Sequence, residues 1–514
     1  MLQSFKNIAT VSSTTLGSRL LGLVRDAMIF AALGTSIWSS AFIVAFTLPN
    51  LFRRLFGEGA LNSALVPTFS DVLGRDGRTK ALGFFNQVFL RALTVLLIIL
   101  VIGIVSLGLI IKLGNLSQRW FLGAQLAMGM LPYMLFICLA AIVSVVLNIF
   151  GRFAIAALTP VILNVAIIVA LYFGMSQNST QSVLVWWICG GVLCGGILQF
   201  LLPSLNLFKL GWRPSLISNQ QFDQSLRELW QLFLPGLIGA AILQINILVS
   251  RLLAFSLNDT AASELYLASR LMELPLGVFT ISIVTVFFPL MAKYLTSGDH
   301  IGFAHSFNSG MRLVLAISLP AGMGLFILSE PIIRALFQWG AFDSSSVLKI
   351  VPLLAIYGLG LPFYSVATYS TRGLYAAKNM SYPVKIAGLC LVLNALLGIF
   401  LMQFLAERGL AFANVLAAVA QALLLWIALS KSHALINIKH IWNALKKVLF
   451  ASLVMGGTCY VSLFIIASLG MSPKSEAYFV VAFLIPTATV VYCSLLYFLD
   501  FEELSNFRKI LNHR

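Results

Sequence analysis

Apolar runs of about twenty residues or more recur along the chain and are separated by short polar breaks. Because a helix needs roughly 20 apolar residues to cross a bilayer, this pattern predicts an all-α polytopic membrane protein. The alternation of apolar and polar residues that is typical of a porin-like barrel is absent. We expect about 14 transmembrane helices, at residues 8–33, 36–70, 84–111, 122–150, 154–174, 183–207, 229–256, 262–292, 308–329, 346–371, 382–404, 410–430, 448–469 and 478–499.

A weak internal repeat with an offset near 222 residues relates two parts of the chain. The matched pairs are Gly17 and Gly239, Pro67 and Pro289, Asn86 and Asn308, Arg91 and Arg312, Gly151 and Gly373, and Pro160 and Pro383. Since the offset covers six predicted spans, it predicts two six-helix lobes in the same orientation, as in many secondary transporters. We expect an N-terminal lobe at 1–210, a C-terminal lobe at 211–430, a basic cytoplasmic linker at 431–447, and two extra transmembrane helices with a cytoplasmic tail at 448–514.

The composition agrees with a membrane protein and explains most of the basic charge. The chain is 60% hydrophobic and only 10% charged, yet its formal net charge is +16. Under the predicted topology, 19 Lys and Arg residues fall on inner segments and 6 on outer loops. This bias follows the positive-inside rule and predicts that both termini are cytoplasmic. The positive charge therefore does not indicate a nucleic-acid partner.

No residue pattern for catalysis, a metal or a cofactor is found. The six cysteines stand singly in apolar runs, and the five histidines lack the spacing of metal ligands. No nucleophile–base set and no phosphate-binding glycine loop that ends in Lys-Ser/Thr occurs. Met1–Thr10 is short and weakly basic, and it predicts no cleavable signal peptide. We expect neither an enzyme nor a nucleotide-driven pump.

Eight arginines lie inside predicted spans or at their ends, where the positive-inside rule does not explain them all. Three of them, Arg91, Arg251 and Arg312, lie near span ends, so we expect their side chains to extend to the membrane interface. The other five lie deeper, in the first, second and eighth spans: Arg19, Arg25, Arg53, Arg54 and Arg270. Charges in such positions face a wet cavity or a partner because they are costly in lipid.

Two interpretations of these five arginines are open. The first is structural, with buried ion pairs that join helices: Arg25–Asp26, Arg54–Glu58 and Arg270–Glu273. The second is a binding cavity, because the arginines outnumber the nearby carboxylates and the guanidinium fork suits phosphate. The excess of positive charge favours an anionic, phosphorylated substrate.

Three sequence segments resemble the MurJ (MviN) family of lipid II flippases. They are AFIVAFTLPNLFRRLFGEGALNSALVP at 41–67, SRLLGLVRD at 18–26 and ASRLMELPLGV at 268–278. The resemblance covers essentially the whole chain and implies the multidrug/oligosaccharidyl-lipid/polysaccharide exporter fold. It also implies a flippase that carries lipid II, the undecaprenyl-pyrophosphate-linked peptidoglycan precursor, from the cytoplasmic to the periplasmic leaflet of a bacterial inner membrane.

The resemblance also assigns residues to the site. By matched position, it places Arg19, Arg25, Arg53 and Arg270 in the cavity that binds the pyrophosphate, and the last two helices beside the polyprenyl tail. Asp26, Arg54, Glu58 and Glu273 are supporting residues. Candidate hinges for alternating access are Pro49, Gly57 and Gly59. Pro49 and Pro275 also predict kinks in their long spans.

The resemblance also bears on ions and partners. Many family members have Asp where this chain has Ser40, and some bind sodium through carboxylates where this chain has Ser250 and Gly398, with only Asn394 retained. We therefore expect no sodium site of that kind, and no other metal or cofactor. The expected partners are lipid II and membrane lipids, with the cell-wall synthesis machinery as a further candidate. We expect the protein to function as a monomer.

Three other functions compete with this interpretation. A flippase for another polyprenyl-pyrophosphate-linked glycan would need the same basic cavity. A drug or cation antiporter of the same superfamily would need a neutral or acidic cavity, which the five arginines disfavour. A non-transporting scaffold for cell-wall assembly would use the arginines only for structure. Lipid bound to the purified protein would separate these classes.

Overall fold

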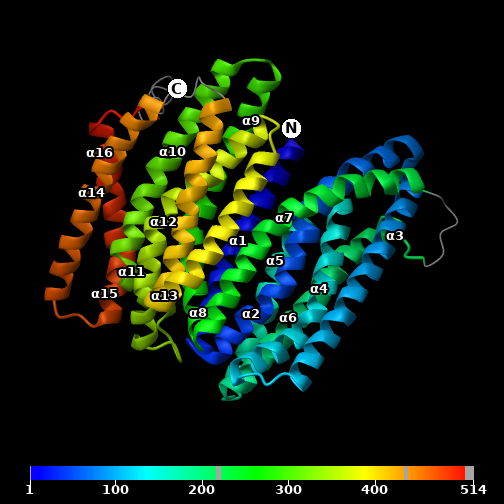
Figure 1. Cartoon of the computed structure of the whole chain (residues 1–514), viewed down its shortest axis with the longest axis horizontal. Helices are drawn as coiled ribbons and strands as arrows, with labels where there is room; N and C mark the ends of the chain where they lie inside the picture. Colours follow the sequence, from blue (N-terminus) through cyan, green and yellow to red (C-terminus); the bar gives the residue numbers. More distant parts are fainter. Residues whose placement is uncertain (1, 216–221, 433–437, 504–514) are drawn as a thin grey trace. The chain divides into compact units, whose positions relative to one another are not determined.

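A computed structural model describes residues 2–215, 222–432 and 438–503, and this part of the chain is helical throughout apart from short connections (Figure 1). It contains no strand. The first helices are α1 (Leu2–Leu33), α2 (Ile37–Arg53), a π-helical segment (Arg54–Gly59), α3 (Ala60–Leu113), α4 (Gln118–Ile149), α5 (Phe153–Ser176), α6 (Gln181–Lys209) and α7 (Asp223–Leu257).

The remaining helices follow in the same way, with two further π-helical segments. They are α8 (Ala261–Pro275), a π-helical segment (Leu276–Thr280), α9 (Ile281–Thr296), α10 (His300–Ile327), α11 (Ser329–Phe337), α12 (Ser344–Ala376), α13 (Ser381–Ser432), α14 (Ile438–Ser468), α15 (Pro473–Phe479), a π-helical segment (Val480–Leu484) and α16 (Ile485–Phe498).

Within the described residues, eleven helical stretches are long and apolar enough to cross a membrane. Two of them cover more than one predicted span. The stretch at 37–113 includes Gly77, which has a φ of 81°, and the stretch at 381–431 includes Ala406, which has a φ of 49°. Both values lie outside the helical region and mark a break in the helix. The multi-pass helical architecture is confirmed, and the count of 14 stays a prediction.

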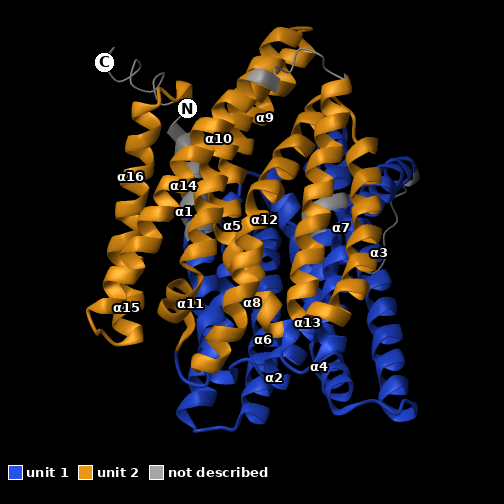
Figure 2. Ribbon diagram, turned by 60° about the vertical axis from the view of Figure 1, so that its left-hand side comes forward, with its two compact units in different colours: residues 1–262, 339–342 blue, residues 263–338, 343–514 orange. Residues whose placement is uncertain are grey.

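The chain forms two compact units (Figure 2). Unit 1 contains residues 1–262 and 339–342, and unit 2 contains residues 263–338 and 343–514. The first of these compact units ends near residue 262, whereas the predicted lobe boundary is at residue 210. The difference arises because α7 packs against α2 and α3 of unit 1. The lobes are defined by the sequence repeat and the units by contacts, so the predicted lobes stay a prediction.

The core of unit 1 is built around α4, in which 72% of the residues in the most apolar stretch are buried. This helix packs against α2, α3 and α6. In unit 2, one apolar cluster joins α9, α10, α12 and α13, with Phe303, Phe307 and Tyr369 fully buried. A second cluster joins α10, α14 and α16, with Val448, Ala451 and Val480 fully buried. In a bilayer such contacts arise from close packing rather than from exclusion of water.

Residues 339–342, between α11 and α12, pack against the end of α1 in unit 1. The backbone N–H of Ala341 donates to the carbonyl of Ala31 at 2.7 Å, and the rings of Phe30 and Phe342 meet edge to face at 5.8 Å. Gly34 and Gly340 have φ values of 61° and 56°, in the left-handed region that favours glycine. A Cβ on Gly340 would collide with the Ala31 carbonyl oxygen.

We expect Gly340→Ala to lower the thermal stability of the protein. The left-handed backbone costs a residue with a Cβ about 1–2 kcal/mol, and the collision with Ala31 adds to this. Gly151→Ala is the matched control, because Gly151 has a φ of 76° and open space around its Cβ position. Unfolding of the purified variants should show a larger loss of Tm for Gly340→Ala than for Gly151→Ala. Equal losses would mean that the contact with α1 contributes nothing.

Candidate functional site

Arg25 on α1 is held in a buried polar cluster. Its Nε and Nη2 donate to Oδ1 of Asp26 at 3.0 and 2.6 Å, and its Nη1 donates to Oδ1 of Asn164 on α5 at 3.0 Å. Asn164 in turn donates from Nδ2 to the carbonyl of Ser18 at 3.0 Å. All three side chains of the cluster are buried. The Arg25–Asp26 ion pair is present, and the two hydrogen bonds of Asn164 tie α5 to α1.

Asn164 is a site residue that the sequence analysis did not identify. The available signal was a single asparagine in the apolar stretch FAIAALTPVILNVAIIVALYF, where a polar side chain needs a partner. Its partner could not be identified from the sequence, because Arg25 lies 139 residues earlier in the chain.

Arg19 lies six residues before Arg25 on α1 and is half-buried. Among the residues that the structure describes, it has no hydrogen bond and no ion pair. Six residues correspond to about 600° of helical rotation, so the two arginines lie on different faces of α1. On α1, Arg25 is therefore paired with a carboxylate, whereas Arg19 is paired with none among the residues that the structure describes.

Arg53 and Arg54 lie where α2 changes to a π-helical segment. Arg53 is half-buried, and its Nε donates to Oδ1 of Asn50 at 3.4 Å, whereas Arg54 is exposed. Pro49 precedes them inside α2, with the predicted hinge glycines Gly57 and Gly59 in the π-helical segment that follows. The side chain of Glu58, the predicted partner of Arg54, lies outside the described residues.

The ion pair of Arg270 on α8 is longer and more exposed than that of Arg25. Its Nη1 lies 3.5 Å from Oε2 of Glu273, with side chains 32% and 51% exposed. An ion pair so long and exposed contributes little to stability. Arg270 belongs to unit 2, while Arg19, Arg25 and Arg53 belong to unit 1. A cavity that all four share stays a prediction.

Arg53 and Arg54 in unit 1 and Arg270 in unit 2 lie close in sequence to a π-helical segment, in spans that contain a proline. In unit 1 the segment begins at Arg54, and in unit 2 it begins at Leu276, directly after Pro275. These starts are 222 residues apart, which is the offset of the predicted repeat. Single π-helical turns inside α-helices occur often at functional sites, because they redirect side chains and loosen the helix. The two spans therefore depart from α-helical geometry at matching positions of the predicted repeat.

The three arginines expected at the interface do not behave alike. Arg91 is exposed, as expected for a side chain that extends to the interface, and Arg251 is partly buried. Arg312 is 5% exposed and is paired with Glu502 and Glu503. The prediction for Arg312 is wrong, because its side chain is buried against these carboxylates instead of extending outward. The two glutamates lie about 190 residues later in the chain.

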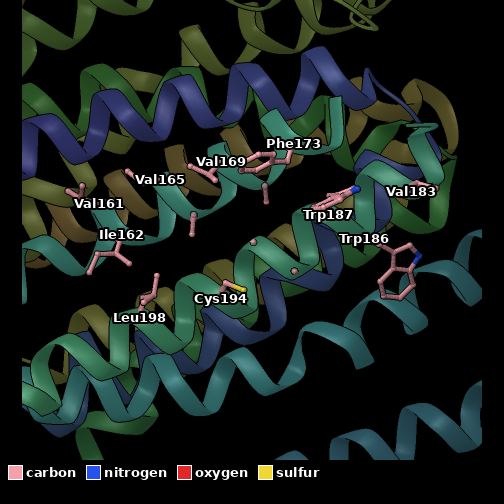
Figure 3. A pocket seen from close by; sticks show the side chains of 14 residues that line it. Val161, Ile162, Val165, Val169, Phe173, Val183, Trp186, Trp187, Cys194 and Leu198 are labelled. Carbon is pink, nitrogen blue, oxygen red and sulfur yellow. The ribbon is translucent and has the colours of Figure 1, made fainter. Parts of the chain in front are cut away.

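An apolar cavity of about 850 Å³ lies between α5 and α6 of unit 1. Figure 3 shows Val161, Val165, Val169 and Phe173 along one helix, facing Trp187, Cys194 and Leu198 on the other. No charged residue lines it. The cavity suits hydrocarbon and cannot stabilise a pyrophosphate, so it is separate from the arginine site.

Residues suited to a metal are sparse. Within the described part of the chain, no three His, Cys, Asp or Glu side chains gather in a group that could hold an ion. Asn394, the retained position of the sodium pattern, is buried on α13, and Ser250 is half-buried on α7.

Comparisons with known proteins give a consistent result. A family model described as "Lipid II flippase MurJ" matches residues 29–488. A probable lipid II flippase MurJ of Rhizobium tropici is 32% identical over 88% of this chain and 86% of its own length. The corresponding protein of Rhizobium meliloti is also 32% identical, over 98% of this chain and 95% of its own length.

Solved structures extend the comparison to the fold. A lipid II flippase MurJ in an inward closed conformation matches with a TM-score of 0.78 and 26% identity, covering 94% of this chain and 97% of that one. An inward-facing multidrug transporter of the MATE family matches with a TM-score of 0.70 and 13% identity, covering 83% of this chain and 98% of that one. The second match shows a shared fold only.

Proposed function

Because the chain belongs to the lipid II flippase MurJ family, we propose that the protein carries lipid II from the cytoplasmic to the periplasmic leaflet of a bacterial inner membrane. The family match supports the substrate. Eleven membrane-length helical stretches within the described part of the chain support a multi-pass membrane protein. The excess of Lys and Arg on the predicted inner segments supports cytoplasmic termini.

The pyrophosphate of lipid II requires cations inside the membrane, and Arg19, Arg53 and Arg270 supply them in this proposal. Arg19 carries the argument, since no described carboxylate balances its charge. The ion pair of Arg270 with Glu273 is 3.5 Å long and partly exposed, so phosphate oxygens can compete with this carboxylate. Arg25 has a supporting role, because its three nitrogens are hydrogen-bonded to Asp26 and Asn164.

Transport in this proposal follows alternating access. The predicted lobes rock about the site, and the chain bends where α-helix gives way to π-helix, near Pro49, Gly57 and Gly59 in the second span and Pro275 in the eighth. The last two helices, α14 and α15–α16, accommodate the polyprenyl tail on exposed apolar side chains such as Phe464 and Phe483.

Lipid binding tests the role of Arg19. We expect native mass spectrometry of the purified protein to detect bound lipid II, and Arg19→Gln to weaken that binding about tenfold or more, because a hydrogen bond to a charged group contributes about 1.5–3 kcal/mol. Arg75→Gln is the control, since Arg75 is exposed and pairs with Asp71 and Asp76. Preferential retention of a different polyprenyl-pyrophosphate glycan, or unchanged binding by Arg19→Gln, would contradict the proposal.

A further inference from the structure

The buried Arg312 on α10 forms an ion cluster with two carboxylates that follow the last helix. Its side chain is 6% exposed, with Nε 2.5 Å from Oε1 of Glu503 and Nη1 3.3 Å from Oε2 of Glu502. Its Nη2 also donates to Oγ of Ser309 at 3.3 Å. All three guanidinium nitrogens therefore have partners, and the carboxylates come from the residues just after α16.

Two further polar contacts fasten α16 close to this cluster. The hydroxyl of Tyr492 donates to the carbonyl of Ala316, one helical turn beyond Arg312, at 2.6 Å. Nζ of Lys447 on α14 donates to the carbonyl of Asp500 at 3.0 Å. Together these contacts join α10, α14, α16 and the residues after α16 within unit 2, where α14 lies beside α10 and α16 lies beside α14 (Figure 1).

The same helices also share apolar packing. The shared cluster includes small side chains, among them Ala316, Ala444, Ala451 and Ala488, beside larger ones such as Leu484. Small residues let helices approach closely, and a polar contact adds a directional constraint to this packing. A buried Arg–carboxylate pair fits only one arrangement, and buried polar groups can specify register in this way.

We propose that Arg312 is a positioning residue for transport: through Glu503 and Glu502 it fixes α14 and α16 against α10, so that this helix pair moves with unit 2 and keeps the surface for the polyprenyl tail in register. This inference rests on the proposed function. Arg312 does not contact the pyrophosphate in this role. Its loss should therefore change how the protein senses the tail of its substrate, rather than how it binds the head group.

Substrates of different tail length separate this role from a general loss of structure. Flipping of full-length lipid II and of an analogue with a short polyprenyl chain would be measured in vesicles for the wild type and for Arg312→Gln. We expect the rate for full-length lipid II to fall at least tenfold per molecule of inserted protein, and the rate for the short-tail analogue to change less than twofold. Hydrogen exchange at the backbone amides of 485–498 should rise in the same variant.

Matched variants complete the test. Arg312→Lys and the exchanged pair Arg312→Glu/Glu503→Arg should restore both the tail preference and the exchange protection. Arg334→Gln, which removes an ion pair to Glu330 on α11, should change neither. If Arg312→Gln does not accumulate in the membrane, the rates for the two substrates would be compared in Glu503→Gln instead. This change is milder because Arg312 keeps its ion pair with Glu502.

Three outcomes would overturn the inference: an equal fall for both substrates, no fall for either, or failure of both Arg312→Lys and the exchanged pair to restore the preference. A wild-type protein that flips neither substrate would instead contradict the proposed function, so the two failures are distinguishable.

Discussion

Arg270→Ala should abolish transport while the protein still inserts in the membrane. Arg270 is the member of the proposed site in unit 2, and it forms a 3.5 Å ion pair with the half-exposed Glu273. Loss of this pair leaves Glu273 accessible to water, so it should cost little stability. It does remove a planar fork that binds phosphate oxygens in pairs, and Lys cannot reproduce that geometry. We expect Arg270→Lys to retain only part of the activity.

Growth of a flippase-depleted bacterium measures this effect, together with the amount of each variant in the membrane. The wild type should restore growth, and Arg270→Ala should not. Arg334→Ala is the matched control, because it also removes an arginine from unit 2, one that is paired with Glu330 at 2.8 Å. Full growth with Arg270→Ala at wild-type amounts would exclude Arg270 from the site.

The second large effect concerns folding, at the cluster of Arg25, Asp26 and Asn164. Asp26→Leu leaves the buried Arg25 without its counter-charge, and breaking a buried pair in this way costs about 3–5 kcal/mol. We expect this variant to accumulate poorly and to unfold at a lower temperature than the wild type. The double variant Arg25→Met/Asp26→Leu removes both charges and should recover most of the loss.

Thermal unfolding of the purified single and double variants gives the coupling between the two residues. If Arg25 has a supporting role, the two residues should be strongly coupled and the double variant should regain stability. Its transport rate should then be only modestly lower than that of the wild type. If the double variant is as stable as the wild type and wholly inactive, Arg25 contacts the substrate directly and our assignment is wrong. Asn164→Leu should show an intermediate loss, because it removes one hydrogen bond to Arg25 and one to the Ser18 carbonyl.

Features that depend on neighbours in sequence could be predicted from the sequence. Apolar runs predicted the membrane helices, because length and hydropathy decide membrane insertion locally. The pair Arg25–Asp26 and the contact Arg270–Glu273 were accessible for the same reason, since their residues are one and three positions apart. Pro49 and Pro275 marked two spans that contain π-helical segments.

Features that depend on distant residues could not be predicted. Asn164 reaches Arg25 across 139 residues, and Arg312 reaches Glu503 across 191. A single sequence does not show which polar residues of different spans face one another, so Arg312 was wrongly placed at the interface. The packing of residues 339–342 with unit 1 could not be predicted for the same reason, because their partners Phe30 and Ala31 lie far away in the sequence.

Transfer of lipid II by the purified protein is the measurement that tests the central claim most directly. The wild type would be reconstituted in vesicles that contain lipid II, and the fraction of head groups accessible on the far side would be followed in time. We predict transfer by the wild type, loss of transfer by Arg270→Ala and retention by Arg334→Ala. Transfer by the wild type and Arg270→Ala at the same rate, or no transfer by a folded wild-type protein that binds lipid II, would contradict it.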